Sequence, residues 1–207
     1  MKAGEVAITL EDASLLERCR RGEPFAWTAL LQRYQDRIYN VCWRIAGDAE
    51  EAADLTQDVF VTALEKIGGF EERSGFFTWL YRIAVNLSLT RRRQRGRRRT
   101  LPIRDGQDGD GEGPALHEPV DRRCGPMTQA LDRETAEAVS RAVDQLDDEH
   151  RTVLVLRDVE SLDYAEIAAI LEVPSGTVKS RLFRARLALR EALGPDFATD
   201  AAERISS

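Results

Sequence analysis

A chain of 207 residues can hold one large or two small domains, and 43% hydrophobic with 32% charged residues describe a folded protein rather than a disordered one. No apolar run approaches the roughly 20 residues that a bilayer span needs, and no signal peptide opens the chain. We therefore expect a cytoplasmic protein without membrane insertion. The three cysteines and two histidines form no metal-binding pattern, so we expect free thiols, no metal and no cofactor.

The net charge of −6 conceals two strongly basic segments. Residues 91–99, RRRQRGRRR, hold seven arginines and no acid, and residues 174–190 hold five basic residues and no acid. By contrast, residues 1–90 hold 14 acids and 10 bases, and residues 100–173 hold 18 acids and 7 bases. Local basic patches bind phosphates, while an acidic remainder limits indiscriminate binding.

Helical periodicity runs through the first hundred residues. It predicts four helices, at about 14–21, 24–46, 48–67 and 74–93. Pro24 suits the first turn of the second helix and Gly47 its end, while Gly68 and Gly69 stop the third.

The third predicted helix has an acidic and polar outer face. Phe60 and Val61 add apolar surface beside it that a core-facing stripe does not need. Taken alone, an ordinary solvated acidic face explains this helix. The polar residues of the face are Glu51, Asp54, Gln57, Asp58 and Glu65.

Aromatic residues cluster at the start of the fourth predicted helix, after the loop Phe70–Gly75. Single-stranded nucleic acids are bound by rings that stack on bases and by cations that follow the backbone, and Asn can read a base edge. Part of this cluster must be core, since Phe77 and Leu80 lie on the inward stripe. The cluster and the polar residues after it are Phe76, Phe77, Trp79, Tyr81, Arg82 and Asn86, followed by the arginine run.

The second half begins with a break in the pattern. Residues 104–126 are rich in Gly, Pro and Asp and bury too little to offset their ordering entropy, so they indicate a flexible linker. Helicity resumes at about Thr128, and a short helix is predicted at about Glu149–Val159. We therefore expect an all-α protein of two small helical domains, 10–100 and 127–195, joined by a flexible acidic linker, 101–126.

Residues 161–190 predict two helices joined by a tight turn. Asp163 can cap the first, and Pro174 with Ser175 interrupts the apolar pattern before the second, basic helix. Such a pair is typical of a helix-turn-helix, whose second helix enters the DNA major groove. A surface hairpin with a solvated arginine face is the alternative.

Three motifs together carry a family resemblance. DLTQDVFVTALEKI, then FFTWLYRIAVN, and after the linker DYAEIAAILEVPSGTVKSRLFRAR resemble the extracytoplasmic-function (group IV) sigma factors of RNA polymerase. In that family the first domain is region 2 and the second is region 4. The resemblance implies a dissociable subunit that binds core RNA polymerase, directs initiation at −10 and −35 promoter elements, and is often held by an anti-sigma factor.

The resemblance also implies site residues. Docking on the clamp helices of the polymerase β′ subunit would use Asp54, Leu55, Gln57, Asp58 and Phe60. The −10 element would be captured by Phe70, Arg73, Ser74, Phe76, Trp79, Tyr81, Arg82, Asn86, Arg91, Arg92 and Arg93. The −35 element would face Ser175, Thr177, Lys179, Ser180, Arg181, Phe183, Arg184 and Arg186. The helices at about 128–159 would meet the β flap.

Two positions depart from the family pattern. Ser88 and Thr90 follow Asn86 where many relatives carry an acid, and Glu172 stands where a helix-turn-helix often has Gly. A stand-alone DNA-binding regulator remains the alternative function, and it would not need residues 48–99. An enzyme is not expected, because the two histidines lie outside any acid–base pairing and no nucleophile motif occurs.

Overall fold

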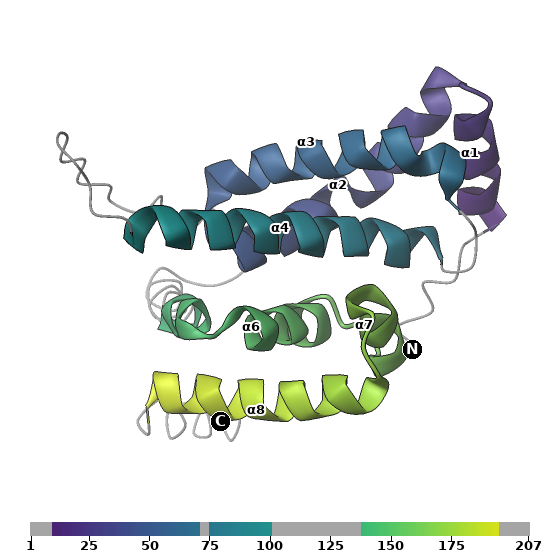
Figure 1. Cartoon of the computed structure of the whole chain (residues 1–207). Helices are drawn as coiled ribbons and strands as arrows, with labels where there is room; N and C mark the ends of the chain where they lie inside the picture. Colours follow the sequence, from purple (N-terminus) through teal and green to yellow (C-terminus); the bar gives the residue numbers. More distant parts are fainter. Residues whose placement is uncertain (1–9, 71–74, 101–137, 195–207) are drawn as a thin grey trace, which may run out of the picture.

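The computed structural model describes residues 10–70, 75–100 and 138–194, and the regular elements within these ranges are all helical (Figure 1). This confirms the predicted all-α class. The N-terminal half contains α1 (Leu10–Arg20), α2 (Pro24–Ala46), α3 (Ala49–Lys66), the 3-10 turn η1 (Ile67–Gly69) and α4 (Phe76–Thr100). The C-terminal half contains a helical segment at 138–145, α6 (Asp148–Leu154), the π-helical turn η2 (Val155–Val159), α7 (Tyr164–Leu171) and α8 (Ser175–Leu193).

Local sequence signals set the ends of α2 and α3. Pro24 occupies the first turn of α2, and Gly47 ends it with φ 78°, a backbone conformation that favours glycine. The Gly47 N–H donates to the carbonyl of Trp43 at 2.7 Å. Asp48 then caps α3 by accepting from the Glu51 N–H at 3.0 Å.

A buried carboxylate fixes α1 against α2. The side chain of Asp12 accepts hydrogen bonds from Arg33 Nη1 at 2.5 Å and from the Tyr34 hydroxyl at 2.8 Å. Burial, with the hydrogen bond to Asp12, raises the pKa of Tyr34. Helix α1 begins at Leu10, four residues before the predicted start, and so includes this carboxylate.

The arginine run continues α4 instead of following it. The fourth helix was predicted to end near Arg93, but α4 extends to Thr100. Arg95 explains part of this: its Nη2 donates to the Ala46 carbonyl at 2.9 Å, and its Nη1 lies 3.3 Å from Glu51 Oε2 and 3.5 Å from Asp48 Oδ2. Arg95 therefore ties α4 to the junction of α2 and α3.

The two halves pack against each other. Figure 1 shows α6 and α7 lying between α4 and α8, and α4 contacts α7 while α2 contacts α6 and η2. Buried apolar residues from both halves, including Leu30, Leu80, Leu156 and Ile167, form one continuous cluster. The predicted linker, residues 101–126, lies outside the described residues.

Cys19 and Cys42 are buried free thiols. Burial raises the pKa of Cys42 to about 11, which keeps the thiol protonated at neutral pH. None of the described helices combines the length and apolar character that crossing a membrane requires.

Candidate nucleic-acid interface

Asp163 begins the helix-turn-helix with a complete capping box. Its Oδ1 accepts from the N–H groups of Ala165 and Glu166, both at 2.8 Å, and Glu166 Oε2 accepts from the Asp163 N–H at 2.8 Å. The predicted cap is confirmed. Helix α7 then buries Ile167 and Ile170, and α8 buries Val178 and Leu182 against it.

Asp163→Ala should lower the free energy of unfolding of the C-terminal half by about 1 kcal/mol, because two N–H groups of α7 lose their acceptor. Urea unfolding followed by circular dichroism would measure the loss. Asp163→Asn is the matched control, since its amide oxygen can still accept, and its loss should be smaller. Equal stability of the Ala variant and the wild type would contradict the cap's contribution.

Glu172 lies in the turn with φ 55° and ψ 42°, the left-handed conformation that a residue other than glycine adopts at some cost. Its N–H donates to the Ala168 carbonyl, which ends α7. Its carboxylate lies 3.0 Å from Nη1 of Arg82 on α4, a contact that glycine could not make.

Helix α8 presents most of the residues predicted to face the −35 element. Ser175, Lys179, Ser180 and Arg184 are exposed, Thr177 is half-buried, and Phe183 is 72% exposed. The first turn of α8 contains no acid, so its N-terminal end can accept a phosphate. Lys179 Nζ lies 5.7 Å from the centroid of the Tyr164 ring.

Two of the α8 arginines are oriented by acids of the same half. Arg181 Nη2 lies 3.0 Å from Glu149 Oε2. Arg186 forms a bidentate salt bridge with Asp158, in which Nη2 and Nε donate at 2.5 and 3.3 Å. The hydrogen bond to Asp158 raises the pKa of Arg186. Each of these arginines is therefore held in place beside an acid that offsets its charge.

The aromatic cluster of α4 is mostly core. Phe70, Phe76 and Tyr81 are buried, and Trp79 is half-buried with its ring centroid 4.9 Å from that of Phe70. Arg20 Nη2 donates to the Phe70 carbonyl at 2.7 Å, which fixes the start of the loop. Arg73 and Ser74, both predicted to contact the −10 element, lie outside the described residues.

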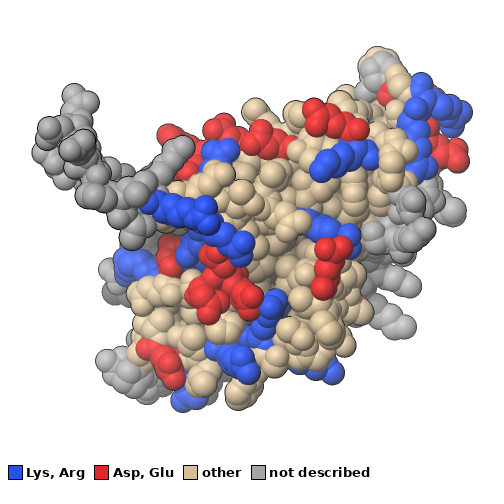
Figure 2. Space-filling view, in the orientation of Figure 1, with Lys and Arg blue, Asp and Glu red and all other residues tan. Residues whose placement is uncertain are grey.

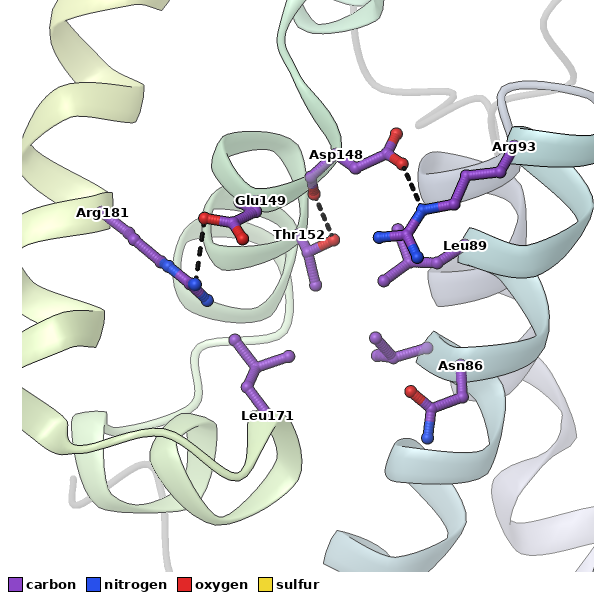
Figure 3. Close-up of a pocket in the computed structure, with 9 residues that line it drawn as sticks. Asn86, Leu89, Arg93, Asp148, Glu149, Thr152, Leu171 and Arg181 are labelled. Atoms are coloured by element: carbon purple, nitrogen blue, oxygen red, sulfur yellow. Dashed lines mark hydrogen bonds and ion pairs between the residues drawn. The ribbon is translucent and has the colours of Figure 1, made fainter. Parts of the chain in front are cut away.

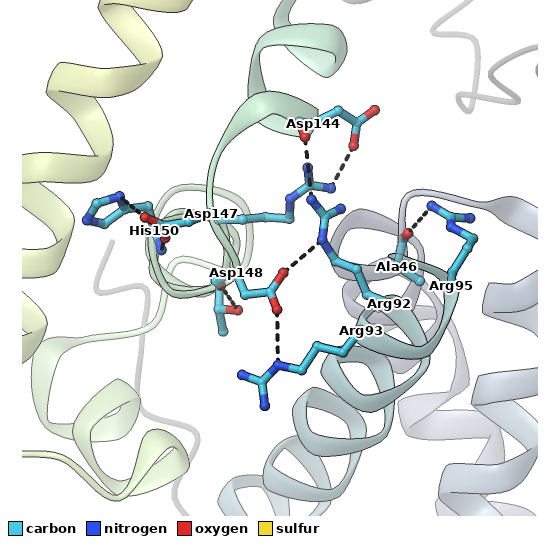
Figure 4. Close-up of polar contacts among 10 residues, drawn as sticks. Ala46, Arg92, Arg93, Arg95, Asp144, Asp147, Asp148 and His150 are labelled. Carbon is cyan, nitrogen blue, oxygen red and sulfur yellow. Dashed lines mark hydrogen bonds and ion pairs between the residues drawn. The ribbon is translucent and has the colours of Figure 1, made fainter. Parts of the chain in front are cut away.

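Three arginines of α4, Arg82, Arg92 and Arg93, face the C-terminal half. Arg82 Nη2 donates to the Ala169 carbonyl at 2.7 Å, in addition to its pair with Glu172. Arg92 Nε and Arg93 Nε donate to the two oxygens of Asp148 at 2.8 and 3.2 Å (Figure 4). Arg91 lies 3.6 Å from Asp58 on α3.

A small cleft of about 140 Å³ lies where α4 meets α6, α7 and α8 (Figure 3). Asn86 and Arg93, predicted for the −10 element, line it together with Arg181, predicted for the −35 element. Leu89 and Leu171 supply apolar lining from opposite halves. The structure thus brings together residues that the sequence analysis assigned to separate promoter elements.

The outer face of α3 differs from the prediction in its apolar residues. Phe60 is only 5% exposed and contacts Trp27 edge to face, with centroids 6.2 Å apart, so it adds no exposed apolar surface. Leu55 is buried too. Val61, as predicted, and Leu64, which the sequence analysis missed, are 55% and 48% exposed. Val61 and Leu64 are three residues apart and lie outside the apolar stripe that faces the core. This spacing could have identified both as exposed from the sequence.

Asp54, Gln57 and Asp58 are exposed beside Val61 and Leu64, so α3 combines acidic and apolar surface. Exposed apolar residues rimmed by polar ones mark a candidate protein-binding face. We call these five residues the α3 face.

The comparisons with known proteins match both halves. Residues 30–98 match sigma-70 region 2, and residues 136–189 match sigma-70 region 4. The RNA polymerase sigma-H factor of Pseudomonas aeruginosa is 37% identical over 186 residues, which cover 89% of this chain and 95% of that relative. This chain belongs to the extracytoplasmic-function sigma factors of the sigma-70 family.

The ECF RNA polymerase sigma factor SigW of Bacillus subtilis is also similar, at 34% identity over 86% of this chain and 94% of SigW. Among solved structures, the sigma factor RpoE of Bartonella quintana in complex with the anti-sigma factor NepR shares the fold, with a TM-score of 0.61 and 23% identity over 80% of this chain and 95% of that chain. The family makes this protein a transcription initiation factor rather than an enzyme or a stand-alone regulator. The exact boundaries 10–100, 101–126 and 127–195 stay a prediction.

Proposed function

We propose that this sigma factor divides its tasks among three surfaces. The α3 face binds the clamp helices of core RNA polymerase, the exposed side of α8 reads the −35 element as duplex, and α4 with the loop before it captures the melted −10 strand. The observation that carries the proposal is α8, because it exposes Lys179, Ser180 and Arg184 and has no acid in its first turn.

At the −10 surface, some residues contact the strand, and others support these residues from beneath. Asn86 is exposed and can contact a base. The positive charge that a nucleic-acid backbone requires comes from Arg82, Arg91, Arg92 and Arg93. The buried rings of Phe70, Phe76 and Tyr81 shape the surface from beneath, and half-buried Trp79 is the ring available for stacking. Extruding a base costs a few kcal/mol, which this surface offsets.

We also propose the remaining assignments. Residues 128–159 meet the polymerase β flap, and the protein acts in the cytoplasm, where polymerase and promoters meet. An anti-sigma factor is a further partner. The B. quintana sigma factor of similar fold was solved with one, and the mixed acidic and apolar α3 face is a surface that such a partner could cover.

Run-off transcription tests the proposal. Purified core polymerase and a pool of promoter fragments are incubated with and without the protein, and the transcripts are sequenced. Transcripts that start only with the protein, downstream of a shared pair of −35 and −10 elements, are expected. DNA binding without polymerase and without new transcripts would contradict it.

A further inference from the structure

Arg20, the last residue of α1, contacts a residue that lies between η1 and α4. Its side chain is exposed, yet its Nη2 donates to the Phe70 carbonyl at 2.7 Å, and its guanidinium carbon lies 5.9 Å from the centroid of the Phe70 ring. One guanidinium therefore holds both the backbone and the ring of a residue 50 positions away. Figure 1 shows α1 at the end of the helical bundle where α3 finishes and α4 begins.

The neighbouring arginines make local contacts instead. Figure 2 shows basic side chains with acids beside them at this end of the molecule. Arg18 pairs with Glu23 at 2.7 Å, and Arg21, the residue after α1, pairs with Glu17 at 3.6 Å. Both pairs stay within α1 and the turn that follows it. Of these three arginines, Arg20 is the one that links α1 to the residues before α4.

The conformation of Phe70 leaves its carbonyl outside a helix. Phe70 follows η1 with φ −67° and ψ 107°, an extended conformation. Its N–H donates to the Ile67 carbonyl at 3.2 Å, which ends η1. Because the Phe70 carbonyl does not belong to a helical hydrogen-bond ladder, its donor must come from another element, and Arg20 supplies one.

The Phe70 ring connects Arg20 to Trp79. Phe70 is 6% exposed, and its ring centroid lies 4.9 Å from that of Trp79, with the ring planes at 38°. Phe76 contacts both rings, with centroids 6.1 Å from Phe70 and 5.7 Å from Trp79. Phe76 in turn contacts Tyr34 of α2 at 5.6 Å. Two buried rings therefore support the half-buried indole, one held by α2 and the other by Arg20 of α1.

We propose that Arg20 is a positioning residue for the melted −10 strand: by holding Phe70, it fixes the orientation of the Trp79 ring on which a base stacks. The inference rests on the proposed function of Trp79 in −10 binding. Stacking needs the face of the indole toward the base, so the apparent affinity falls with the fraction of molecules in which the ring is correctly oriented. Arg20 acts through Phe70 and not through a phosphate.

A double-mutant cycle tests this role in holoenzyme assembled from core polymerase. The probe is a labelled single-stranded oligonucleotide that carries the −10 element of a promoter identified by run-off transcription. Arg20→Ala should weaken binding about fivefold. Trp79→Leu, which keeps an apolar side chain but removes the stacking face, should weaken it about tenfold or more. In the Trp79→Leu background Arg20→Ala should add no further loss, and additive losses would overturn the inference.

Salt dependence and a neighbouring arginine separate positioning from charge. Loss of a direct phosphate contact lowers the slope of log K against log salt concentration by about 0.7 for a single strand, whereas Arg20→Ala should leave the slope unchanged. Arg21→Ala removes the same charge one residue away and should bind the oligonucleotide as the wild type does. Arg20→Lys keeps a donor and a cation and should recover part of the affinity. A lowered slope for Arg20→Ala, or an equal loss in Arg21→Ala, would overturn the positioning role.

Acrylamide quenching of Trp79 fluorescence tests the same role without DNA. Trp27→Phe and Trp43→Phe leave Trp79 as the single tryptophan of the full-length chain. In this background Arg20→Ala should increase quenching and leave the urea midpoint nearly unchanged, since an exposed contact adds little to stability. Unchanged quenching would overturn the inference. Increased quenching, together with wild-type oligonucleotide binding by Trp79→Leu, would confirm that Arg20 positions Trp79 and overturn the −10 role of Trp79 instead.

Discussion

Asp58→Arg is expected to abolish transcription, with a loss of about 100-fold or more in run-off product. Asp58 is 56% exposed on the α3 face, and its pair with Arg91 at 3.6 Å is a surface contact worth less than about 1 kcal/mol. The variant should therefore fold normally. An acidic binding face requires a partner of complementary charge, so reversing the charge at Asp58 juxtaposes like charges, which costs several kcal/mol.

Glu17→Arg is the matched control for Asp58→Arg. It reverses the same charge at an exposed position of α1, away from the α3 face, and should transcribe as the wild type does. Fluorescence anisotropy with a −35 duplex should give equal affinities for both variants and the wild type. Full transcription by Asp58→Arg would remove the α3 face from the polymerase interface.

The second large effect is expected at Arg151, which is fully buried in α6. Its Nη1 donates to Asp144 at 2.6 Å, while its Nε and Nη2 have no hydrogen-bond partner among the described residues. Burial lowers the pKa of Arg151. Arg151→Ala should lower the free energy of unfolding by about 2–4 kcal/mol, because the lost side chain leaves a cavity in the core of the C-terminal half.

Arg151→Met separates packing from charge. Methionine fills most of the same space and removes the two unpartnered nitrogens, and Asp144 is half exposed and can be solvated once its partner is lost. Its stability should therefore lie within about 1 kcal/mol of the wild type. Urea unfolding of both variants gives the comparison. Equal losses for Ala and Met would show that the charge, and not the packing, is what matters at this position.

Local signals made several elements predictable from the sequence. Pro24 and Gly47 define α2 because one fits a first helical turn and the other permits a left-handed end, and both act on their own neighbours. Asp163 is recognisable as a cap for the same reason. Helix α8 could be assigned a DNA-binding role because its basic residues and its lack of acids lie within one short segment.

Contacts between distant residues were not predictable. Helix α4 continues through the arginine run because acids far away in the chain, such as Asp148 and Glu51, neutralise its charges. Phe60 is buried because Trp27 of another helix covers it. The docking of the two halves depends on Tyr81 and Glu160, which are 79 positions apart, and no periodicity within either helix predicts that they meet.

Arg82 carries a consequence for how this protein can evolve. It is bound by the Ala169 carbonyl and Glu172 across the junction of the two halves, and it is also a proposed contact of the −10 strand. A substitution of Arg82 that changed promoter preference would therefore also remove two contacts between the halves. Promoter preference and the packing of the two halves would then change together, and compensating changes are expected at position 172.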